Sequence, residues 1–433
     1  MILPLTIVFL LLIFRPWFTL SGTLSAGDWP YLFTQHIQSF SWLPEPRFLW
    51  LAPYYQIVTK FAVQIGLSWH FIERLLWFWP WIAVSFYSSF KFTKSWLGAI
   101  MYTTNTYALM LLAGGQMGVA MAYAIAPLVL TNRWIFPVQV MFDPRIALLT
   151  LIVALRKNPK QFIVPVLVTI IIHTYWWVPI LKNPAIVGTQ FQEATSSAVK
   201  YLSFASFSNS LSFLHPNWPE NIFGKVYFQR PEFLIIPIVA FAGLLFKANA
   251  YYALLALIGA FLAKGINEPF GGIYLWLFEN VPGFSLFRDP TKFYLYIALG
   301  YSVLISRIKK PMLVFLFLLF WAFTLREAIL GSLPGTFQPV KVPNEYTKLT
   351  GDNVGWYPKK SRFSFSGSDF ISLENIRYVA VPTDVRGEIF VTDRKYDESK
   401  HQDAILFIST MSGVRRLDEY KELAVFEVFK ESP

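Results

Sequence analysis

The sequence predicts an α-helical polytopic membrane protein that carries a small extracytoplasmic α/β domain. Hydrophobic residues make up 55% of its 433 positions and charged residues 15%, whereas a soluble domain usually carries about 25% charged residues. Apolar runs close to the length of a membrane span recur along the chain. Beyond about residue 332 the chain becomes mostly polar. We therefore expect a membrane domain over residues 1–332 and a small α/β domain over residues 333–433.

About nine hydrophobic spans are expected in the first part. They lie near residues 3–20, 71–89, 96–113, 117–132, 161–181, 232–247, 249–264, 291–306 and 311–330. The stretches 48–67 and 145–155 are ambiguous. The first contains Pro53 and Lys60 and is compatible with a helix along the interface, and the second is short enough for a re-entrant or interfacial helix. The opening stretch lacks the charged n-region of a signal peptide, so we expect it to be retained.

Basic residues predict the orientation of the spans. They gather after the second span and between the fourth and fifth, the sixth and seventh, and the eighth and ninth: Lys91, Lys94, Arg133, Arg145, Arg156, Lys157, Lys160, Lys247, Arg307, Lys309 and Lys310. With a cytoplasmic N-terminus all of them fall in cytoplasmic loops, as the positive-inside rule expects. The loops 21–70, 183–231 and 265–290 and the C-terminal domain are then extracytoplasmic. This pattern accounts for the net charge of +11. The sequence shows no basic stripe with exposed stacking aromatics, so nucleic-acid binding is not expected.

The C-terminal region is expected to begin with a linker rich in Gly and Pro, "GSLPGTFQPVKVPNEY". The runs "IRYVAVP" and "LAVFEVF" have the β-branched and aromatic residues of short strands. The segment beginning "DESKHQDAILF" has the acidic start of a helix. The chain has no cysteine, which excludes disulfides and thiolate metal sites.

Asp28, in "GDWPY", is the first candidate functional residue. A carboxylate at the outer end of a span could act as a general base, which needs reach to a hydroxyl group and partial desolvation. The alternative is an N-cap, because Asp28 precedes an expected helix with Pro at an early position. The two roles are compatible.

Charged residues of the first outer loop raise the question of a metal. His36, Glu45, Arg47 and Glu73 lie in or next to it, and carboxylates with an imidazole could hold a divalent cation. No H-x-x-x-H or D-x-D spacing is present, so solvated loop charges are the favoured alternative and no metal ligand is assigned.

His173 lies inside the fifth span, where ionisable groups are functional candidates. The favoured alternative there is a neutral histidine bonded to a neighbouring helix.

Polar side chains of the outer loops are candidates for contacts to a sugar or its acceptor. In the expected turn between the third and fourth spans, a Gly-Gly-Gln sequence allows close backbone approach and a polar contact, although a simple turn explains the same residues. In "FSNSLSFLHPNWPENIFGK" the imidazole, amide and indole groups suit sugar hydroxyls and rings, although an aromatic belt explains Trp and Phe equally well. The candidates are His36, Gln116, His215, Asn217 and Trp218.

Arg288, Asp289 and Lys292 stand at the expected outer mouth of the eighth span, in "FRDPTKF". An arginine and a lysine one turn apart at a helix start can hold a phosphate through the guanidinium fork and the helix dipole. The alternative is a surface pair of Arg288 with Asp289, beside a Lys292 whose ammonium reaches water along the apolar surface.

Several of these motifs together resemble the bacterial GT-C membrane glycosyltransferases. The motifs are "GDWPY", the helix pair "GGQ…AYAIAPL", the span entry "FRDPTKF" and the tail "IRYVAVPTD…DRKYDE…LAVFEVF". The similarity covers most of the chain. The groups that it most resembles are the YfhO-like proteins and the N-terminal region of arabinofuranosyltransferase D.

The resemblance implies a multi-span GT-C-like fold with an outward-facing site, a polyprenyl-phosphate-linked sugar as donor, and a glycan or lipid acceptor. By position it implies that Asp28 is the catalytic base and that Arg288 and Lys292 bind the donor phosphate. The first outer loop lacks an adjacent acidic pair, which leaves dependence on a divalent cation such as Mg²⁺ or Mn²⁺ open. An inverting transfer fits these residues, because it needs one base, and cations can stabilise the charge that develops on the leaving phosphate.

Two other functions remain open from the sequence. A transporter or flippase of lipid-linked sugars would need alternating gates and usually repeated halves, and the sequence shows no internal repeat. A non-catalytic membrane assembly protein that displays its C-terminal domain would not need its outer polar groups to converge on one site.

Overall fold

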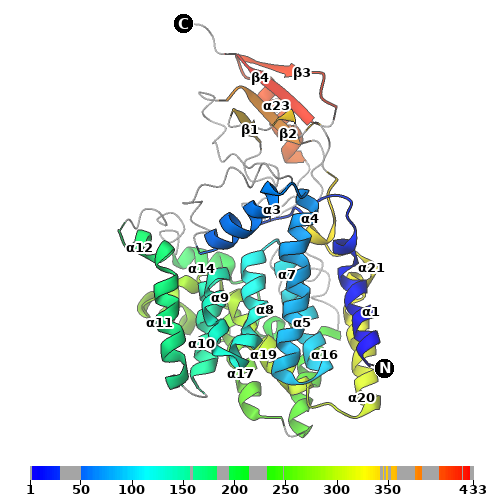
Figure 1. The fold of residues 1–433 in the computed structure, drawn as a ribbon, viewed down its shortest axis with the longest axis vertical. Helices are drawn as coiled ribbons and strands as arrows, with labels where there is room; N and C mark the ends of the chain where they lie inside the picture. The colour runs from blue at the N-terminus through cyan, green and yellow to red at the C-terminus, as the bar shows by residue number, and fades with distance from the viewer. Residues whose placement is uncertain are drawn as a thin grey trace.

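The computed structural model of the chain shows a helical bundle with a small sheet beyond one end (Figure 1). The expectation of a mostly helical chain with a small sheet is thus confirmed. The structure describes residues 2–29, 50–156, 159–182, 195–213, 232–246, 248–341, 345, 348–349, 353–357, 376–382, 399–421 and 423–429.

The helices of the bundle follow one another closely in the sequence. The first half contains α1 (Ile2–Phe14), η1 (Arg15–Phe18), η3 (Tyr54–Thr59), α3 (Lys60–Gln64), α4 (Trp69–Glu73), η4 (Arg74–Phe78), α5 (Trp79–Thr93), α6 (Trp96–Thr104), α7 (Thr106–Ala113), α8 (Met117–Thr131), η5 (Arg133–Ile135), α9 (Phe136–Phe142) and α10 (Pro144–Leu155). The second half contains η6 (Pro159–Phe162), α11 (Ile163–Ile172), α12 (Thr174–Lys182), α14 (Ser196–Leu202), α15 (Phe207–Leu211), α16 (Glu232–Phe241), η10 (Ala242–Phe246), α17 (Ala250–Ala263), α18 (Gly271–Asn280), η11 (Phe284–Phe287), η12 (Pro290–Phe293), α19 (Tyr294–Ile305), α20 (Pro311–Thr324), α21 (Arg326–Leu330) and η13 (Gly335–Phe337).

Each expected span falls on one helix or on a run of consecutive helices. The ambiguous stretch 48–67 contains η3 and α3, and α3 lies across the end of the bundle that faces the sheet (Figure 1). Among the described residues, no helix taken singly combines the length and the apolar character needed to cross a membrane. The two helices Pro159–Ile172 and Thr174–Lys182, which meet at a bend of 64°, satisfy both conditions when taken together.

Polar caps divide the apolar runs into short helices. Asn105 separates α6 from α7: its Oδ1 accepts a hydrogen bond from the Ala108 amide at 3.0 Å, and its Nδ2 donates to the Met101 carbonyl at 3.0 Å. Asp143 and Asn249 cap the first turns of α10 and α17 in the same way. Such side chains satisfy the amide groups that a helix start leaves without intrahelical partners, so one hydrophobic run becomes two helices.

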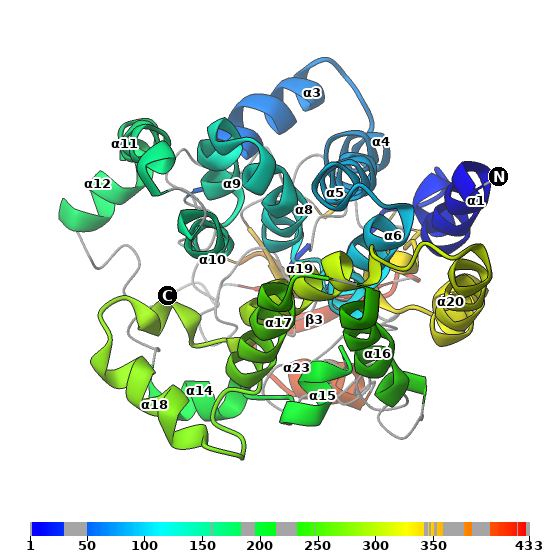
Figure 2. The same cartoon turned by 90° about the horizontal axis from the view of Figure 1, so that it is seen from below.

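The core of the bundle is built around α19, which lies in the middle when the molecule is seen from below (Figure 2). Every residue of α19 is buried. Two glycines let α17 and α19 approach closely. A Cβ atom at Gly300 would lie 2.5 Å from the Tyr252 carbonyl oxygen, and one at Gly259 would lie 2.7 Å from the Tyr296 Cβ. The two backbones are therefore nearly in contact.

The rim of the bundle exposes large apolar side chains. Figure 2 shows α1, α11 and α20 at the rim. The exposed side chains on these helices are Leu5, Ile7, Val8, Leu11, Leu12, Ile163, Val164, Leu167, Ile170, Ile171, Ile172, Met312, Phe315, Leu316, Leu319 and Phe323. Large apolar side chains exposed along a helix face mark a face that meets lipid or another protein.

The small α/β region consists of four strands and a helix in the described residues. They are β1 (Val354–Trp356), β2 (Tyr378–Pro382), α23 (Ser399–Ser409), β3 (Val414–Leu417) and β4 (Leu423–Val428). The strand order is β1-β2-β4-β3, with β1 parallel to β2 and the other neighbours antiparallel. Apolar residues of α23 pack with those on one face of β2 and β4. The expected strands in "IRYVAVP" and "LAVFEVF" are confirmed, and so is the expected helix, which begins at Ser399.

The described part of the expected linker is packed on the bundle. The Trp17 indole donates to the Thr336 carbonyl at 3.1 Å, and the Thr336 hydroxyl donates to the Leu112 carbonyl at 2.8 Å. Thr23 and Val340 form a backbone bridge. The linker therefore joins the C-terminal end of α7 to the segment that carries Asp28.

Candidate functional site

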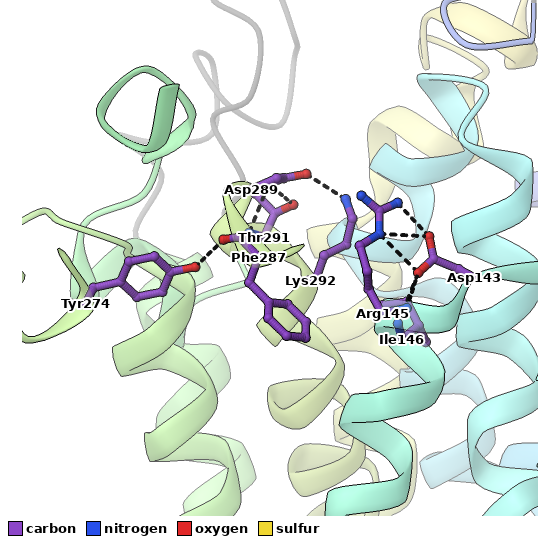
Figure 3. Close-up of polar contacts among 8 residues, drawn as sticks. All are labelled: Asp143, Arg145, Ile146, Tyr274, Phe287, Asp289, Thr291 and Lys292. Carbon is purple, nitrogen blue, oxygen red and sulfur yellow. Dashed lines mark hydrogen bonds and ion pairs between the residues drawn. The ribbon is translucent and has the colours of Figure 1, made fainter. Parts of the chain in front are cut away.

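Two ion pairs meet between the α9–α10 turn and the entry to α19 (Figure 3). Asp143 and Arg145 form the first pair, and Asp289 and Lys292 form the second. Figure 3 shows the Arg145 and Lys292 side chains next to each other, with each carboxylate on the outer side of its own cation. Two cations and two carboxylates thus make one mixed cluster, which we call the ion-pair cluster.

Asp143 holds Arg145 in a fixed position. Its side chain caps α10 by accepting hydrogen bonds from the Arg145 amide at 2.8 Å and the Ile146 amide at 3.1 Å. Both carboxylate oxygens also contact the Arg145 guanidinium, with Nη2 to Oδ2 at 2.6 Å. The Asp143 side chain is 1% exposed and that of Arg145 is 25% exposed. The guanidinium is therefore anchored on one edge, and the Arg145 side chain remains partly exposed.

The protonation state of Asp143, which lies outside the expected spans, follows from the same contacts. Burial alone would raise the pKa of this carboxyl group, but the charge and hydrogen bonds of Arg145, together with the charge of Lys292, hold the pKa below its usual range. Asp143 is therefore ionised, and the pair is a true ion pair.

Lys292 is held by Asp289 rather than exposed at the surface. Its Nζ lies 2.6 Å from Asp289 Oδ2, and its side chain is 3% exposed. Asp289 Oδ1 accepts from the Thr291 amide at 3.1 Å and hydroxyl at 2.6 Å, which caps η12. The alternative of a lysine that extends to water is thus wrong, because this buried ammonium is paired with a carboxylate one turn away. Arg288, next to it, is half-buried.

The position of Arg145 in the cluster differs from the side of the bundle on which the sequence placed it. The basic pattern grouped Arg145 with Arg133 and Arg156 on the side opposite to Lys292. Instead, α9 and α10 form a hairpin whose turn is Asp143, so Arg145 and Arg156 lie at opposite ends of α10, roughly 16 Å apart along the helix. Arg156 stacks on the Tyr251 ring at 3.7 Å at the start of α17. The grouping of Arg145 is therefore wrong, because the hairpin returns it to the Lys292 side.

Asp28 is exposed and sits in a segment docked on the α7–α8 turn. Its backbone amide donates to the Gly114 carbonyl at 2.9 Å, and Ala26 and Trp29 exchange two backbone hydrogen bonds of 2.8 Å around it. A Cβ atom at Gly115, whose φ is +69°, would lie 2.2 Å from the Ala26 carbonyl oxygen. The expected tight Gly-Gly turn is confirmed, and its close approach is to the Asp28 segment. Gln116, at the end of this turn, is half-buried.

The α7–α8 turn also connects Asp28 to the ion-pair cluster. A Cβ atom at Gly118, in the first turn of α8, would lie 3.1 Å from the Phe142 carbonyl oxygen, and Phe142 immediately precedes Asp143. Asp28 thus docks on Gly114 in this turn, and Phe142, the residue before Asp143, packs against Gly118 in the first turn of α8. Both groups stand at the same end of α8.

Glu73 departs from its favoured interpretation as a solvated loop charge. It is completely buried and forms an ion pair with Arg74, Oε1 to Nη1 at 2.8 Å. Its remaining contacts are to the segment 23–29, described below. Among the residues that the structure describes, no group of three or more His, Cys, Asp or Glu side chains could hold a metal ion. His36, Glu45, Arg47, His215, Asn217 and Trp218 lie outside the described residues.

His173 has the structural role that was favoured for it. Its Nε2 lies 2.9 Å from the Pro137 carbonyl oxygen on α9, and its Nδ1 accepts a hydrogen bond from the Trp176 indole at 3.1 Å. One ring nitrogen donates and the other accepts, which is the pattern of a neutral imidazole. It joins α11 and α12 to α9.

Comparisons of the chain with family models, with curated proteins and with solved structures found no match.

Proposed function

We propose that this chain is an integral membrane glycosyltransferase of the GT-C type. It transfers a sugar from a polyprenyl-phosphate donor to an extracytoplasmic glycan or lipid acceptor, with Asp28 as general base. The observation that carries the proposal is the placement of an exposed aspartate, whose backbone is docked on the α7–α8 turn, at the same end of α8 as a cluster of fixed cations.

A membrane location is supported by the rim of the bundle. The outer faces of α1, α11 and α20 expose Leu, Ile, Val and Phe side chains that a water-facing surface would not favour. Charged residues are concentrated elsewhere, at the helix ends and in the α/β region. Adjacent short helices would cross the bilayer as broken spans whose freed backbone groups are satisfied by caps such as Asn105.

The chemistry requires one proton acceptor and a stabilised leaving group. The acceptor hydroxyl gives its proton to the Asp28 carboxylate while its oxygen attacks the anomeric carbon of the sugar. The bond from the anomeric carbon to the phosphate oxygen breaks, and the phosphate leaves with the electron pair. A single displacement inverts the anomeric configuration. Developing charge on the phosphate is best stabilised by cations that are already oriented.

The cations for this role are Arg145, Arg288 and Lys292. Arg145 was missed in the sequence because "FDPRIALL" has the pattern of a capped helix start. Its guanidinium is held on one edge by Asp143, and the side chain is one quarter exposed, so donors remain for a phosphate oxygen. Lys292 already neutralises Asp289 and contributes mainly through its charge.

The test is glycosyl transfer by purified parent and Asp28→Asn protein in lipid nanodiscs, with a polyprenyl-phosphate sugar as donor. We expect turnover to fall about 10²–10⁴-fold, the usual cost of losing a general base, with unchanged thermal stability. Asp418→Asn is the matched control, since Asp418 is an exposed carboxylate in the α/β region. Near-normal turnover of the Asp28→Asn protein would exclude the proposed role.

A further inference from the structure

A single buried carboxylate ties the Asp28 segment to the helix that begins at Trp69. Glu73 Oε1 accepts a hydrogen bond from the Leu24 amide at 2.8 Å. Glu73 Oε2 accepts from the Thr23 hydroxyl at 3.2 Å and from the Trp29 indole at 3.1 Å. Three donors of one seven-residue segment thus converge on one side chain.

The fourth contact of this carboxylate supplies its counter-charge. Arg74 Nη1 lies 2.8 Å from Oε1 and also donates to the His70 carbonyl at 2.7 Å. Each carboxylate oxygen therefore accepts two hydrogen bonds, which fills the acceptor sites of an ionised carboxylate. Both charged side chains are completely buried, so a substrate cannot reach Glu73 and its role must be exerted through its neighbours.

The neighbour that matters is Trp29, which directly follows Asp28. Its indole is fixed by Glu73 and packs against three rings, those of Trp69 at 5.9 Å, Trp77 at 5.0 Å and Phe78 at 5.7 Å between centroids. On the other side of Asp28, the α7–α8 turn holds the backbone. Asp28 lies between these two anchors, and removal of either would leave its segment held at one side only.

An ion pair in this position is costly compared with apolar packing, because both charges are taken out of water. An apolar residue in place of Glu73 would leave the Leu24 amide and the Trp29 indole buried without acceptors. A glutamine would place an NH₂ group, a donor, opposite other donors. The geometry therefore requires an acceptor oxygen at both positions of the Glu73 side chain.

We propose that Glu73 is a positioning residue for Asp28. It fixes the height and direction of the Asp28 carboxylate at the end of the bundle by holding the segment 23–29 in one conformation. This inference rests on the proposed function of Asp28 as general base. Glu73 itself does not take part in the chemistry.

The first experiment measures position without using activity. The chain contains no cysteine, so Asp28→Cys provides a single site for a nitroxide spin label. We expect Glu73→Gln to increase the mobility of this label, whereas Glu232→Gln does not. Glu232 is the matched control because it is also buried and paired with an arginine, Arg326, at 2.8 Å. Equal mobility of the label in the parent and the Glu73→Gln background overturns the inference.

The second experiment separates positioning from general destabilisation. In proteins with Asp28, we expect Glu73→Gln to lower kcat about 10- to 100-fold, the scale of a misplacement of about 1 Å, and to leave the donor KM within about twofold. In the Asp28→Asn background the same change should have no further effect on kcat. Thr23→Val removes one of the four hydrogen bonds and should also lower kcat, but less strongly. This milder variant keeps the series informative if Glu73→Gln unfolds.

The outcomes distinguish the two claims. Normal turnover of the Asp28→Asn protein refutes the proposed function, while the spin-label result still decides whether Glu73 positions the segment. A Glu73→Gln effect of equal size in both backgrounds shows that Glu73 does not act through Asp28 and overturns the inference.

Discussion

Replacement of Asp143 tests whether the ion-pair cluster is as tightly built as its geometry indicates. Asp143→Ala removes two interactions at once. Loss of the cap on α10 costs about 1 kcal/mol, within a range of about 0.5–2 kcal/mol. Loss of the carboxylate also leaves Arg145 without its counter-charge. Breaking a fully buried pair costs about 3–5 kcal/mol, and because Arg145 is 25% exposed we expect about 2–3 kcal/mol here, or about 3–4 kcal/mol in total.

Asp143→Asn separates the two contributions. The amide oxygen of asparagine can still accept from the Arg145 and Ile146 amides, so the cap remains and the charge is lost. We expect this variant to lose about 2–3 kcal/mol, roughly 1 kcal/mol less than the alanine variant. Asn249→Ala is the matched control, because Asn249 is an exposed cap on α17, and it should cost about 1 kcal/mol.

The assay is reversible denaturation of the purified protein in mild detergent, followed by circular dichroism, with pH as an internal check. The pKa of Asp143 is lower in the folded protein than in the unfolded chain, so its contribution is present above the unfolded pKa and is lost as pH falls. The difference in free energy of unfolding between the parent and Asp143→Asn should stay constant down to about pH 4 and shrink below it. The reasoning is refuted if the free energy of unfolding of Asp143→Ala lies within about 0.5 kcal/mol of the parent value. It is also refuted if Asp143→Ala is no more destabilised than Asn249→Ala.

Three further predictions concern the Asp28 segment, the phosphate and the orientation of the chain. Gly115→Ala should displace the Asp28 segment and lower turnover, because its Cβ would lie 2.2 Å from a carbonyl oxygen. Gly66 also has a positive φ, but a Cβ there would have nothing within 4 Å, so Gly66→Ala should lower only stability. Equal turnover of the two variants would contradict the docking. Arg288→Ala should weaken binding of a polyprenyl-phosphate sugar more than Arg288→Lys, since lysine keeps the charge but not the fork, and parent-like affinity of both variants would remove Arg288 from the site. A single cysteine at Asp418 should react with an impermeant maleimide in intact cells and one at Lys309 only after permeabilisation, and the reverse pattern would invert the proposed topology.

Local patterns were sufficient for the elements that carry their own apolar residues. The strands β2 and β4 and the helix α23 were predicted because each contributes apolar side chains to the small core. The strands β1 and β3 were not predicted. β1 has three residues, and β3, with the sequence VRRL, has two exposed arginines at its centre. Both become strands through pairing with a neighbour, which a single sequence does not display.

The ion-pair cluster could not be predicted because its two halves lie about 147 residues apart in the chain, from Arg145 to Lys292. Each half has a complete local explanation, since Asp143 caps α10 and Asp289 caps η12. Their proximity depends on the α9–α10 hairpin. Glu73 is different, because an adjacent Glu-Arg pair at the start of an apolar run is an indication of a functional or structural role in itself. Its interpretation as a solvated charge gave too little importance to that context.

The arrangement of charge at this end of the bundle suits a ligand that arrives and leaves as an anion. Four isolated charges in a partly buried site would be costly whenever the site is empty, whereas two balanced pairs are stable without a ligand. A phosphate can share Arg145 with Asp143 because Asp143 holds one edge of the guanidinium and the side chain is one quarter exposed. Lys292 can add its field without moving, since Asp289 fixes its ammonium. Cations that are already oriented need little reorganisation when charge develops on a leaving group. On the proposed function, the carboxylates of the cluster therefore serve to orient the cations, and Asp28, which is exposed and docked on a separate turn, is left to accept the proton.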